Sequence, residues 1–562
     1  MKTLWLLVAL LMGRTTAFAE PAPRIHPKLV VFIAVDALRY DYLTRFEPYL
    51  SDRGFKLLLQ QGANFTDAHI DHFRASTAPG HAAMLSGASG DLSGIIDNEW
   101  YDRELGQKVN CVEDPAAFLL NGTDHRGSKK GRSPRHFLVS TVGDELKLAT
   151  NFRARVVGIS YKDRGAILPA GRLADAAYWF DDHSGHFISS TYYMERLPGW
   201  VRSFNRDSSP DRYFHKEWRK LLGEEAYALS REDDFPNELD YKGLGRVFPH
   251  QVDGRQKHPG PDFYKAFTYT PFSDEHLAEF ARAVVENEHL GADDVPDLLT
   301  ISFSATDRIG HAYGPYSQEQ EDQVLRLDRV LQEFFRYLDE KIGLADVLIL
   351  LTADHGGAPI PEYLARFKVD AGRIDREPPP PGETSVAIPR AVENALDKTF
   401  GPADWVEAFV KPNLYLNLST VAEKKLDLAQ VERHAADALL QLKGVGQVFT
   451  STQIAAGAYP NNLVSHKVVS QFFPGRSGNL IVVNRPYYVT SSSHRSGDKG
   501  TDHETPYDYD THIPFLFFGK PFKPGRYAMP VRLNDMAPTL ANVLELTAPS
   551  GNEGRVLYEA LR

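Results

Sequence analysis

The stretch LVVFIAVD at residues 29–36 decides the fold class of this chain. Leu29 to Val35 is an unbroken apolar run rich in β-branched residues, and such a run is typical of a strand buried on both faces. Four other short apolar runs repeat the pattern and are also predicted to be strands: Val156 to Ile159, Leu298 to Ser304, Val347 to Leu351 and Phe515 to Phe518.

Helical patterns lie between these runs. Residues His276 to Asn287 carry apolar side chains at helix-face spacing, and Ser273 is the expected N-cap. Glu319 to Ile342 shows a second pattern of this kind. Strands that alternate with helices predict an α/β fold, in which a doubly wound, mostly parallel sheet carries helices on both faces.

Two segments depart from this alternation. Residues from about 207 to 271 are polar, rich in Pro and Gly and weakly periodic, so we expect an insertion folded onto the core. After the run Pro378 to Pro381, a helix over Leu426 to Leu442 lies between the apolar runs Leu414 to Leu418 and Gly446 to Thr450. This arrangement predicts a small α+β cap over residues 360–475, with a catalytic core formed by residues 20–360 and 475–562.

The composition excludes several classes of protein. The chain has 562 residues, of which 42% are hydrophobic, enough for a large core and too many for a disordered protein. Its net charge is −11 and no stretch gathers Lys and Arg into a stripe, so we expect no nucleic-acid partner. The single cysteine, Cys111, cannot form an intrachain disulfide, and its neighbours do not make the Cys-x-Pro-x-Arg pattern of a sulfatase nucleophile.

The N-terminus has the pattern of a signal peptide. Within residues 1–19, Lys2 is followed by the apolar run Leu4 to Met12 and by the A-x-A site Ala17 to Ala19. A membrane anchor is the alternative, but this run is about half of the roughly 20 residues that a bilayer crossing needs. We therefore predict cleavage near Ala19 and a periplasmic or secreted mature chain without a transmembrane anchor.

Acidic and imidazole side chains gather at the ends of the predicted strands. They are Asp36, Asp307, His311, Asp354, His355 and, shortly before the fifth strand, His503. Ligand sites of open α/β sheets lie at the carboxyl ends of the strands. Three carboxylates that converge there would repel one another unless cations lay among them. A lone Asp–His pair is often a surface feature, but the six residues together predict a metal site.

A candidate nucleophile lies in the segment STAPGH, Ser76 to His81. Its Pro and Gly are typical of a strand-to-helix turn that can present the hydroxyl of Thr77 toward the same edge of the sheet. The alternative is that Thr77 only caps a helix beginning near Pro79. A hydroxyl becomes an effective nucleophile when a divalent cation lowers its pKa, so no separate general base is required.

Seven motifs in the order of the chain resemble the alkaline phosphatase superfamily: VDALRYD (35–41), STAPGH (76–81), NEWYDR (98–103), YKDR (161–164), DRIGH (307–311), ADHGG (353–357) and GTDH (500–503). Within it they are most similar to the bacterial periplasmic alkaline phosphatases that use threonine. These enzymes are relatives of the type I phosphodiesterases and nucleotide pyrophosphatases. The motifs extend over residues 28–520.

The resemblance implies two zinc ions. Asp307, His311 and His503 would hold one, and Asp36, Asp354 and His355 would hold the other. Thr77 would be the nucleophile, and Asn98, Lys162 and Arg164 would contact the phosphoryl oxygens. A third carboxylate cluster for the magnesium ion of the serine-type enzymes is not evident, so the prediction is two metal ions.

The predicted substrates are small-molecule phosphate monoesters. The positive charges of two zinc ions, Lys162 and Arg164 exceed the negative charges of the three Asp ligands. This excess balances an alkoxide and a phosphate dianion, whereas a diester would leave the site too positive. Two in-line displacements through a phosphothreonine are expected. Two alternatives stay open: a phosphodiesterase or nucleotide pyrophosphatase on the same dimetal core, and a binding protein that has lost turnover. The oligomeric state is left open.

Overall fold

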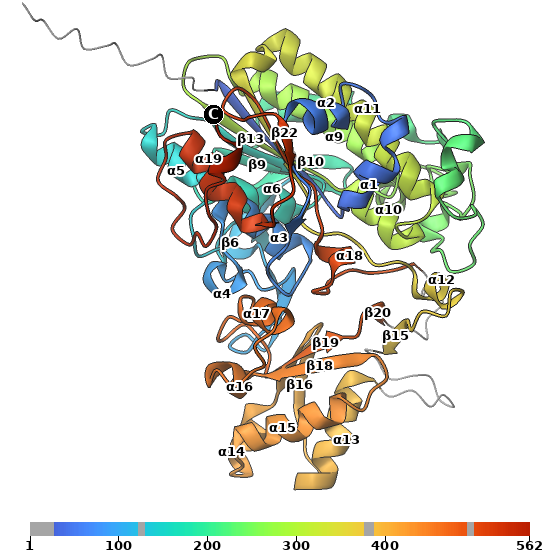
Figure 1. Ribbon diagram of the computed structural model, residues 1–562, viewed down its shortest axis with the longest axis vertical. Helices are drawn as coiled ribbons and strands as arrows, with labels where there is room; N and C mark the ends of the chain where they lie inside the picture. The colour runs from blue at the N-terminus through green and yellow to red at the C-terminus, as the bar shows by residue number, and fades with distance from the viewer. Residues whose placement is uncertain (1–26, 122–129, 376–386, 492–499) are drawn as a thin grey trace, which may run out of the picture.

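The computed structural model describes residues 27–121, 130–375, 387–491 and 500–562 (Figure 1). The predicted signal peptide, residues 1–19, and the proline run Pro378 to Pro381 lie outside the described residues.

A sheet of eleven strands forms the centre of the described chain, in the order β22-β2-β21-β14-β1-β13-β8-β9-β10-β6-β7. Strand β1 (Leu29–Val35) pairs in parallel with β13 (Asp297–Phe303) on one side and with β14 (Val347–Thr352) on the other. Strand β8 (Val156–Ser160) is parallel to β13, and β21 (Phe515–Phe518) is antiparallel to β14. All five predicted strands form, and the mostly parallel sheet is confirmed.

The edges of this sheet contain the strands that the apolar runs did not indicate. Beyond β8 the order continues through one parallel and several antiparallel neighbours, and the other edge adds two short strands beyond β21. Their bounds are β9 (Ala176–Asp181), β10 (His186–Ser190), β6 (Glu113–Leu120), β7 (Lys130–Arg132), β2 (Ala63–Phe65) and β22 (Gly525–Tyr527).

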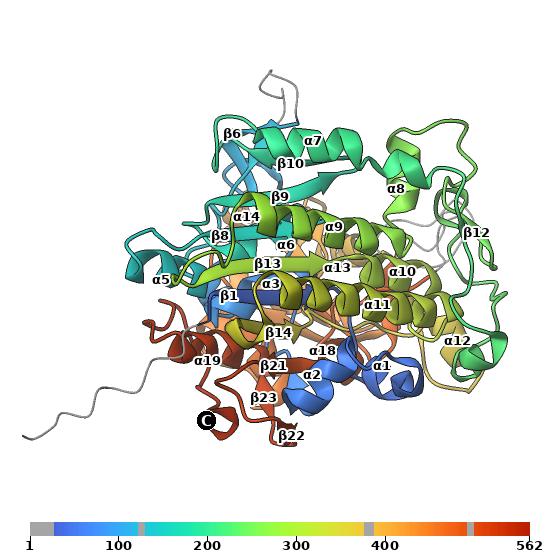
Figure 2. The ribbon, with the colours of Figure 1, turned by 90° about the horizontal axis from the view of Figure 1, so that it is seen from above.

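Helices cover both faces of the sheet, as Figures 1 and 2 show. One face carries α9 (Phe272–Asn287), α10 (Ala305–Tyr313) and α11 (Gln318–Lys341). The other face carries α3 (Thr77–Ser86), α5 (Val142–Ala149), α6 (Asp163–Ala170) and α19 (Met536–Val543). The predicted doubly wound α/β fold is therefore confirmed.

The start of α9 differs from the prediction. Its N-cap is Pro271, and Ser273 lies inside the first turn, where its hydroxyl donates to the carbonyl of Thr270 at 2.9 Å. The fixed φ of proline, here −63°, is already helical, so the helix begins earlier than a serine cap would place it. The second predicted helix does begin at a serine, because the Ser317 side chain accepts a hydrogen bond from the Gln320 amide.

Burial of the central strands holds the strand ends in place. Every residue of β1 is at most 1% exposed, and the strand packs within one continuous apolar cluster that includes both of its neighbours. Full burial of a Val, Leu, Ile or Phe side chain stabilises a fold by about 1.5 to 3 kcal/mol. The loops that follow β1, β13 and β14 therefore start from fixed points at one edge of the sheet.

The segment expected to be an insertion, residues 207–271, consists of short elements packed beside α11. Strands β11 (Glu217–Trp218) and β12 (His250–Gln251) pair with each other, and helix α8 (Pro261–Phe267) follows. Trp218 is fully buried, and its indole N–H donates to Asp322 of α11 at 2.6 Å.

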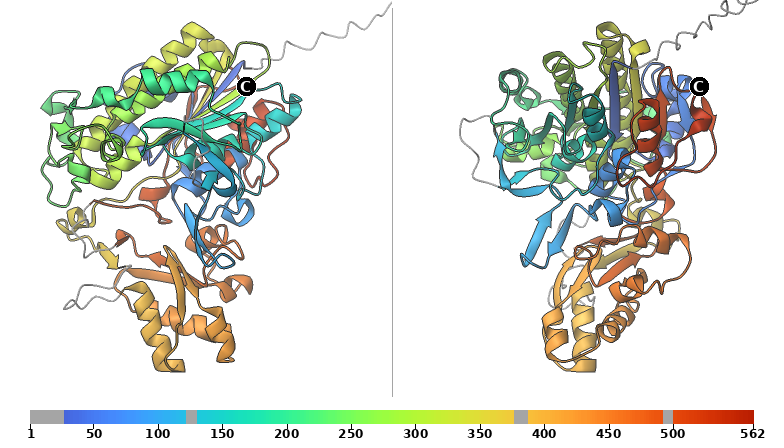
Figure 3. Two further views of the ribbon diagram at one scale, coloured as in Figure 1. Left: turned by 180° about the vertical axis from the view of Figure 1, so that it is seen from behind. Right: turned by 90° about the vertical axis from the view of Figure 1, so that its left-hand side faces the viewer.

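A smaller unit lies below the main body in Figure 1 and in both views of Figure 3. Its four-stranded sheet has the order β16-β17-β19-β18, covered by α13 (Ile388–Phe400) and α15 (Leu428–Leu439) around a separate apolar cluster. The strands are β16 (Val406–Val410), β17 (Asn413–Leu416), β18 (Val445–Thr450) and β19 (Leu480–Asn484). Strand β19 extends this sheet past residue 475, the expected boundary, while the division into domains stays a prediction.

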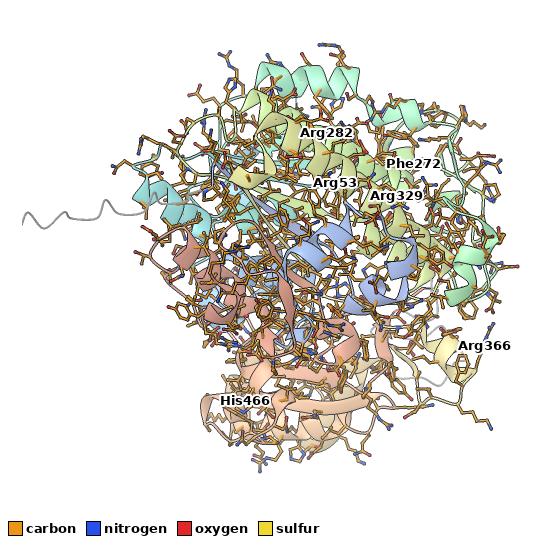
Figure 4. The ribbon with its side chains drawn as sticks, turned by 45° about the horizontal axis from the view of Figure 1, so that its top comes forward. Arg53, Phe272, Arg282, Arg329, Arg366 and His466 are labelled. Carbon is orange, nitrogen blue, oxygen red and sulfur yellow. The ribbon has the colours of Figure 1, made fainter. Side chains whose placement is uncertain are left out.

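Figure 4 labels residues of both parts. The view places Arg282 of α9 and Arg329 of α11 over the main body, and His466 of α17 (Leu463–Val469) in the smaller unit.

Candidate active site

Three neighbouring strands bring the predicted carboxylates to one edge of the sheet. Asp36 follows β1 directly, and its amide donates to the carbonyl of Phe303, the last residue of β13. Asp307 lies in the first turn of α10, just after β13, and Asp354 follows β14. All three are at most 5% exposed.

The three predicted imidazole ligands are oriented by backbone carbonyls. The Nδ1 atoms of His311, His355 and His503 lie 3.0, 2.8 and 2.7 Å from the carbonyl oxygens of Thr501, Gly356 and Ala75, respectively. A histidine whose Nδ1–H donates to a carbonyl keeps the lone pair on Nε2 for a metal.

The Nε2 atoms point at the carboxylates. His355 Nε2 lies 3.2 Å from Asp36 Oδ1 and 3.7 Å from Asp354 Oδ2. Asp307 Oδ1 lies 3.3 Å from His311 Nε2 and 3.7 Å from His503 Nε2. His355 thus lies beside Asp36 and Asp354, and Asp307 lies beside His311 and His503. His311, Asp502 and His503 also offer ligand atoms within 4.8 Å of one another.

The two sets form one continuous cluster. Asp36, Asp354 and His355 offer ligand atoms within 4.8 Å of one another, but so do Asp307, His355 and His503. The rings of His355 and His503 are stacked with centroids 3.7 Å apart.

The donor atoms of this cluster fit divalent cations. Both oxygens of Asp36, Oδ2 of Asp354 and Nε2 of His355 are buried and make no hydrogen bond of good geometry among the described residues. Their polar neighbours are charged groups instead: Lys162 lies beside Asp36, and His81 lies beside Asp354. Buried carboxylates in this state need cations beside them. Burial alone lowers the pKa of His355, but the carboxylates of Asp354 and Asp36 outweigh it and raise this pKa to about 10. Oxygen and imidazole ligands in such sets suit zinc.

Thr77 lies at the first position of α3, beside this cluster of carboxylates and imidazoles. Ser76 is the N-cap residue, so the alternative that Thr77 is the cap does not hold. The Thr77 hydroxyl accepts a hydrogen bond from Lys162 Nζ at 3.2 Å. A Cβ built on Gly80, one turn further on, would lie 2.4 Å from the carbonyl oxygen of Asp354. Glycine at this position therefore lets α3 pack directly on the Asp354 backbone.

Lys162 lies among the carboxylates. Its Nζ is 2.5 Å from Asp36 Oδ2 and 2.6 Å from Asp307 Oδ2. Burial raises the pKa of Asp307, but Lys162 together with His311 and His355 holds this pKa below its ordinary value. One ammonium therefore contacts both carboxylate sets and the Thr77 hydroxyl.

Asn98 and Arg164 approach the same point from two other elements. The side-chain oxygen of Asn98 accepts from the amide of Ala78 at 2.9 Å, which leaves its NH₂ group to donate elsewhere. Arg164 lies in the first turn of α6, for which Lys162 is the N-cap residue. Its buried Nε has no hydrogen-bond partner among the described residues.

A second group of charged residues borders this site and was not predicted. Arg74, Asp97, Lys411, Asp502 and Glu504 form buried or partly buried ion pairs around Asn98 and His503. The sequence indicates this group only in one way: Asp502 and Glu504 flank the predicted metal ligand His503. Cys111, in contrast, is a free thiol whose pKa burial raises, so it is poorly suited to act as a nucleophile.

Comparisons with known proteins assign this arrangement to a family. The family model of type I phosphodiesterase / nucleotide pyrophosphatase matches residues 30–508. The chain belongs to this family. Its resemblance to the alkaline phosphatase superfamily, predicted from the motifs, is thereby confirmed.

Curated relatives of this family match nearly the whole chain. Alkaline phosphatase PhoV of Synechococcus elongatus is 36% identical over 547 residues, 96% of this chain and 94% of the relative. Alkaline phosphatase PafA of Elizabethkingia meningoseptica is 33% identical over 562 residues, 99% and 98% of the two chains. A protein of Myroides odoratus named calcium-transporting ATPase is 36% identical over 538 residues, 95% of each chain.

The crystal structure of wild-type PafA matches with a TM-score of 0.87 at 33% identity, covering 97% of this chain and 100% of that one. This similarity extends across the α/β fold and the smaller unit. Among the described residues, no helix combines the length and the apolar character needed to cross a membrane.

Proposed function

We propose that this chain is an exported alkaline phosphatase that hydrolyses phosphate monoesters through a phosphothreonine intermediate at a two-zinc site. One observation carries the proposal: the Thr77 hydroxyl contacts Lys162 Nζ, which lies within 2.6 Å of both Asp36 and Asp307. A nucleophile, a cation and the two carboxylate sets thus meet at one point. Family members named alkaline phosphatases that match nearly the whole chain support the same conclusion.

The metal ligands are proposed from the distances within the cluster. Asp307, His311 and His503 would hold one zinc, and Asp36, Asp354 and His355 the other. When bound, the two ions would lower the pKa of the attacking hydroxyl and stabilise the charge on the leaving oxygen.

The residues of the chain perform the remaining steps. Thr77 Oγ1, whose proton passes to solvent, forms the bond to phosphorus as the bond to the leaving oxygen breaks on the opposite side. The leaving alkoxide takes up a proton from water. Lys162, at 3.2 Å from Oγ1, donates to a phosphoryl oxygen, and the free NH₂ of Asn98 and the guanidinium of Arg164 donate to the others. In the second displacement water attacks the phosphothreonine, which releases phosphate and restores the Thr77 hydroxyl.

Monoesters are favoured because the site contains two cationic side chains besides the proposed zinc ligands. A monoester dianion presents more charge to Lys162 and Arg164 than a diester, in which one oxygen carries a second organic group. The family description supports a second candidate, a phosphodiesterase or nucleotide pyrophosphatase on the same core. A binding protein without turnover is disfavoured because the hydroxyl and all six candidate ligands are present.

The experiment is a turnover assay on the zinc-loaded mature chain, with Thr77→Ala as the matched control. We expect release of phosphate from monoesters by the native chain, a phosphoryl group on Thr77 in acid-quenched samples, and neither with the variant. A variant that binds zinc and still releases phosphate at the native rate would disprove the role of Thr77. Export is tested separately, by whether the N-terminus of the secreted or periplasmic protein lies near Glu20.

A further inference from the structure

A network of partly buried charges connects the smaller unit to the candidate active site. Beside Asn98 lies a cavity of about 270 Å³, lined on one side by residues of the core and on the other by Phe409, Val410 and Lys411. Lys411 directly follows β16, the edge strand of the small sheet. The smaller unit therefore contributes a cation to the wall of this cavity.

The ammonium of Lys411 contacts the residues on either side of His503. Its Nζ lies 2.5 Å from Asp502 Oδ2 and 2.5 Å from Glu504 Oε2. The Lys411 side chain is only 18% exposed. Charged groups this close and this poorly hydrated interact more strongly than a surface pair.

The same network continues to the nucleophile. Glu504 Oε1 lies 2.6 Å from an Arg74 guanidinium nitrogen, and Arg74 Nε donates to Asp97 Oδ2 at 2.5 Å. The other oxygen of Asp97 accepts from the Ser76 hydroxyl at 3.2 Å and from the Asn98 amide at 2.7 Å. One chain of contacts thus extends from Lys411 to Asn98 and to Ser76, the residue before Thr77.

The backbone after His503 is strained. Glu504 has φ of 90°, a conformation that a residue with a side chain rarely adopts. Such a residue costs of order 1 to 3 kcal/mol and persists where its surroundings hold it. Here both oxygens of the Glu504 carboxylate are held, one by Lys411 and the other by Arg74.

We propose that Lys411 is a positioning residue, which fixes the loop of Asp502, His503 and Glu504 so that His503 Nε2 points toward Asp307. This inference rests on the proposed function, since it assigns His503 to the zinc set with Asp307 and His311. Two contacts complete the orientation: the His503 amide donates to Asp502 Oδ1 at 3.0 Å, and Nδ1 bonds the Ala75 carbonyl. The smaller unit thereby takes part in building the metal site.

The alternative is that Lys411 only joins the smaller unit to the core. The chain offers a matched control for that role in Arg103, which lies just after β4 (Glu99–Asp102). Its guanidinium pairs with Glu407 of β16 at 2.7 Å and donates to the carbonyl of Leu416 of β17 at 3.0 Å. It therefore joins the same two parts through the same strand. Among the described residues, its side chain contacts Glu407, Leu416, Asn479 and Tyr415, none of which belongs to the loop of His503.

The test measures zinc affinity of the full-length mature chain by competition with a chelator, starting from metal-free protein. Lys411→Met removes the charge and keeps most of the apolar part of the side chain, and Arg103→Met removes the charge at the control position. Loss of a group that orients a metal ligand typically weakens metal binding by about 10- to 100-fold, which is the effect expected of Lys411→Met. Arg103→Met should bind zinc as the native chain does, and Lys411→Arg should recover most of the loss.

Two results would overturn the inference: native zinc affinity in Lys411→Met, or an equal loss in Arg103→Met. If Lys411→Met does not fold, Glu504→Gln carries the same test, because it removes one carboxylate charge that Lys411 holds. Native zinc affinity in that variant would then overturn the inference. A different result would contradict the proposed function alone. In that case the native chain and the variants would show the zinc affinities expected here, but the native chain would release no phosphate from monoesters.

Discussion

The preference for monoesters should depend on Lys162 and Arg164. Lys162 Nζ lies 3.2 Å from Thr77 Oγ1, so oxygens of a phosphoryl group bonded to Oγ1 fall within its reach. Arg164 has a buried Nε without a hydrogen-bond partner among the described residues, which leaves it free to donate. Replacing both residues with alanine removes two charged donors from one phosphoryl group.

The size of the effect follows from the burial of these contacts. The Lys162 side chain is 7% exposed and that of Arg164 is 20% exposed, so neither contact is strongly screened by water. A buried charged contact to a reacting group contributes about 2 to 4 kcal/mol. This corresponds to roughly 30- to 1000-fold in kcat/KM for each residue. The double variant should lose at least about 1000-fold on a monoester and much less on a diester.

The assay compares kcat/KM for one monoester and one diester on the native chain and the Lys162→Ala, Arg164→Ala double variant. Zinc content must be equal in both proteins, because Lys162 also neutralises Asp36 and Asp307. The control is Arg132→Ala, which removes a cation that pairs with Asp163 on the same helix at 2.6 Å. Equal fractional losses on the two esters in the double variant would refute the reasoning.

Three further outcomes are expected. Elemental analysis of unchelated protein should find two zinc ions per chain, and chelation should abolish turnover that zinc restores; full activity with far less metal would contradict this. Asp354→Asn should reduce kcat by at least about 100-fold with the fold retained, as circular dichroism would verify. Thr77→Ser should keep substantial activity and form a phosphoserine, because the hydroxyl remains, and an inactive Thr77→Ser that still binds zinc would argue against this role.

The sequence predicts the centre of the fold well because its signal there is local. The runs Leu29 to Val35 and Val347 to Leu351 are apolar throughout, and each forms a strand buried in the sheet. Adjacent parallel strands end at the same edge, so residues that follow those strands in sequence also lie close in space. Asp36 and Asp354 could be placed together for this reason.

Other features depend on contacts that local patterns do not encode. The pairing of Lys411 with Glu504 joins residues far apart in sequence, and it exists only because the smaller unit packs beside the loop of His503. Local sequence patterns also do not indicate that Lys162 contacts Asp36 and Asp307. These contacts form because the folded chain brings buried carboxylates together, and their charge favours a cation beside them. Strand β19 falls beyond the expected boundary because its place is set by pairing with β17 and β18.

The most direct test of the central claim is the ratio of kcat/KM for a phosphate monoester to that for a phosphodiester with the same leaving group, measured on the zinc-loaded native chain. A shared leaving group removes differences in its intrinsic reactivity, so the ratio reports how the site treats the charge of the phosphoryl group. The account predicts a ratio well above one, with phosphothreonine detected at Thr77 during monoester turnover. A ratio below one would contradict it and would identify the chain as a phosphodiesterase.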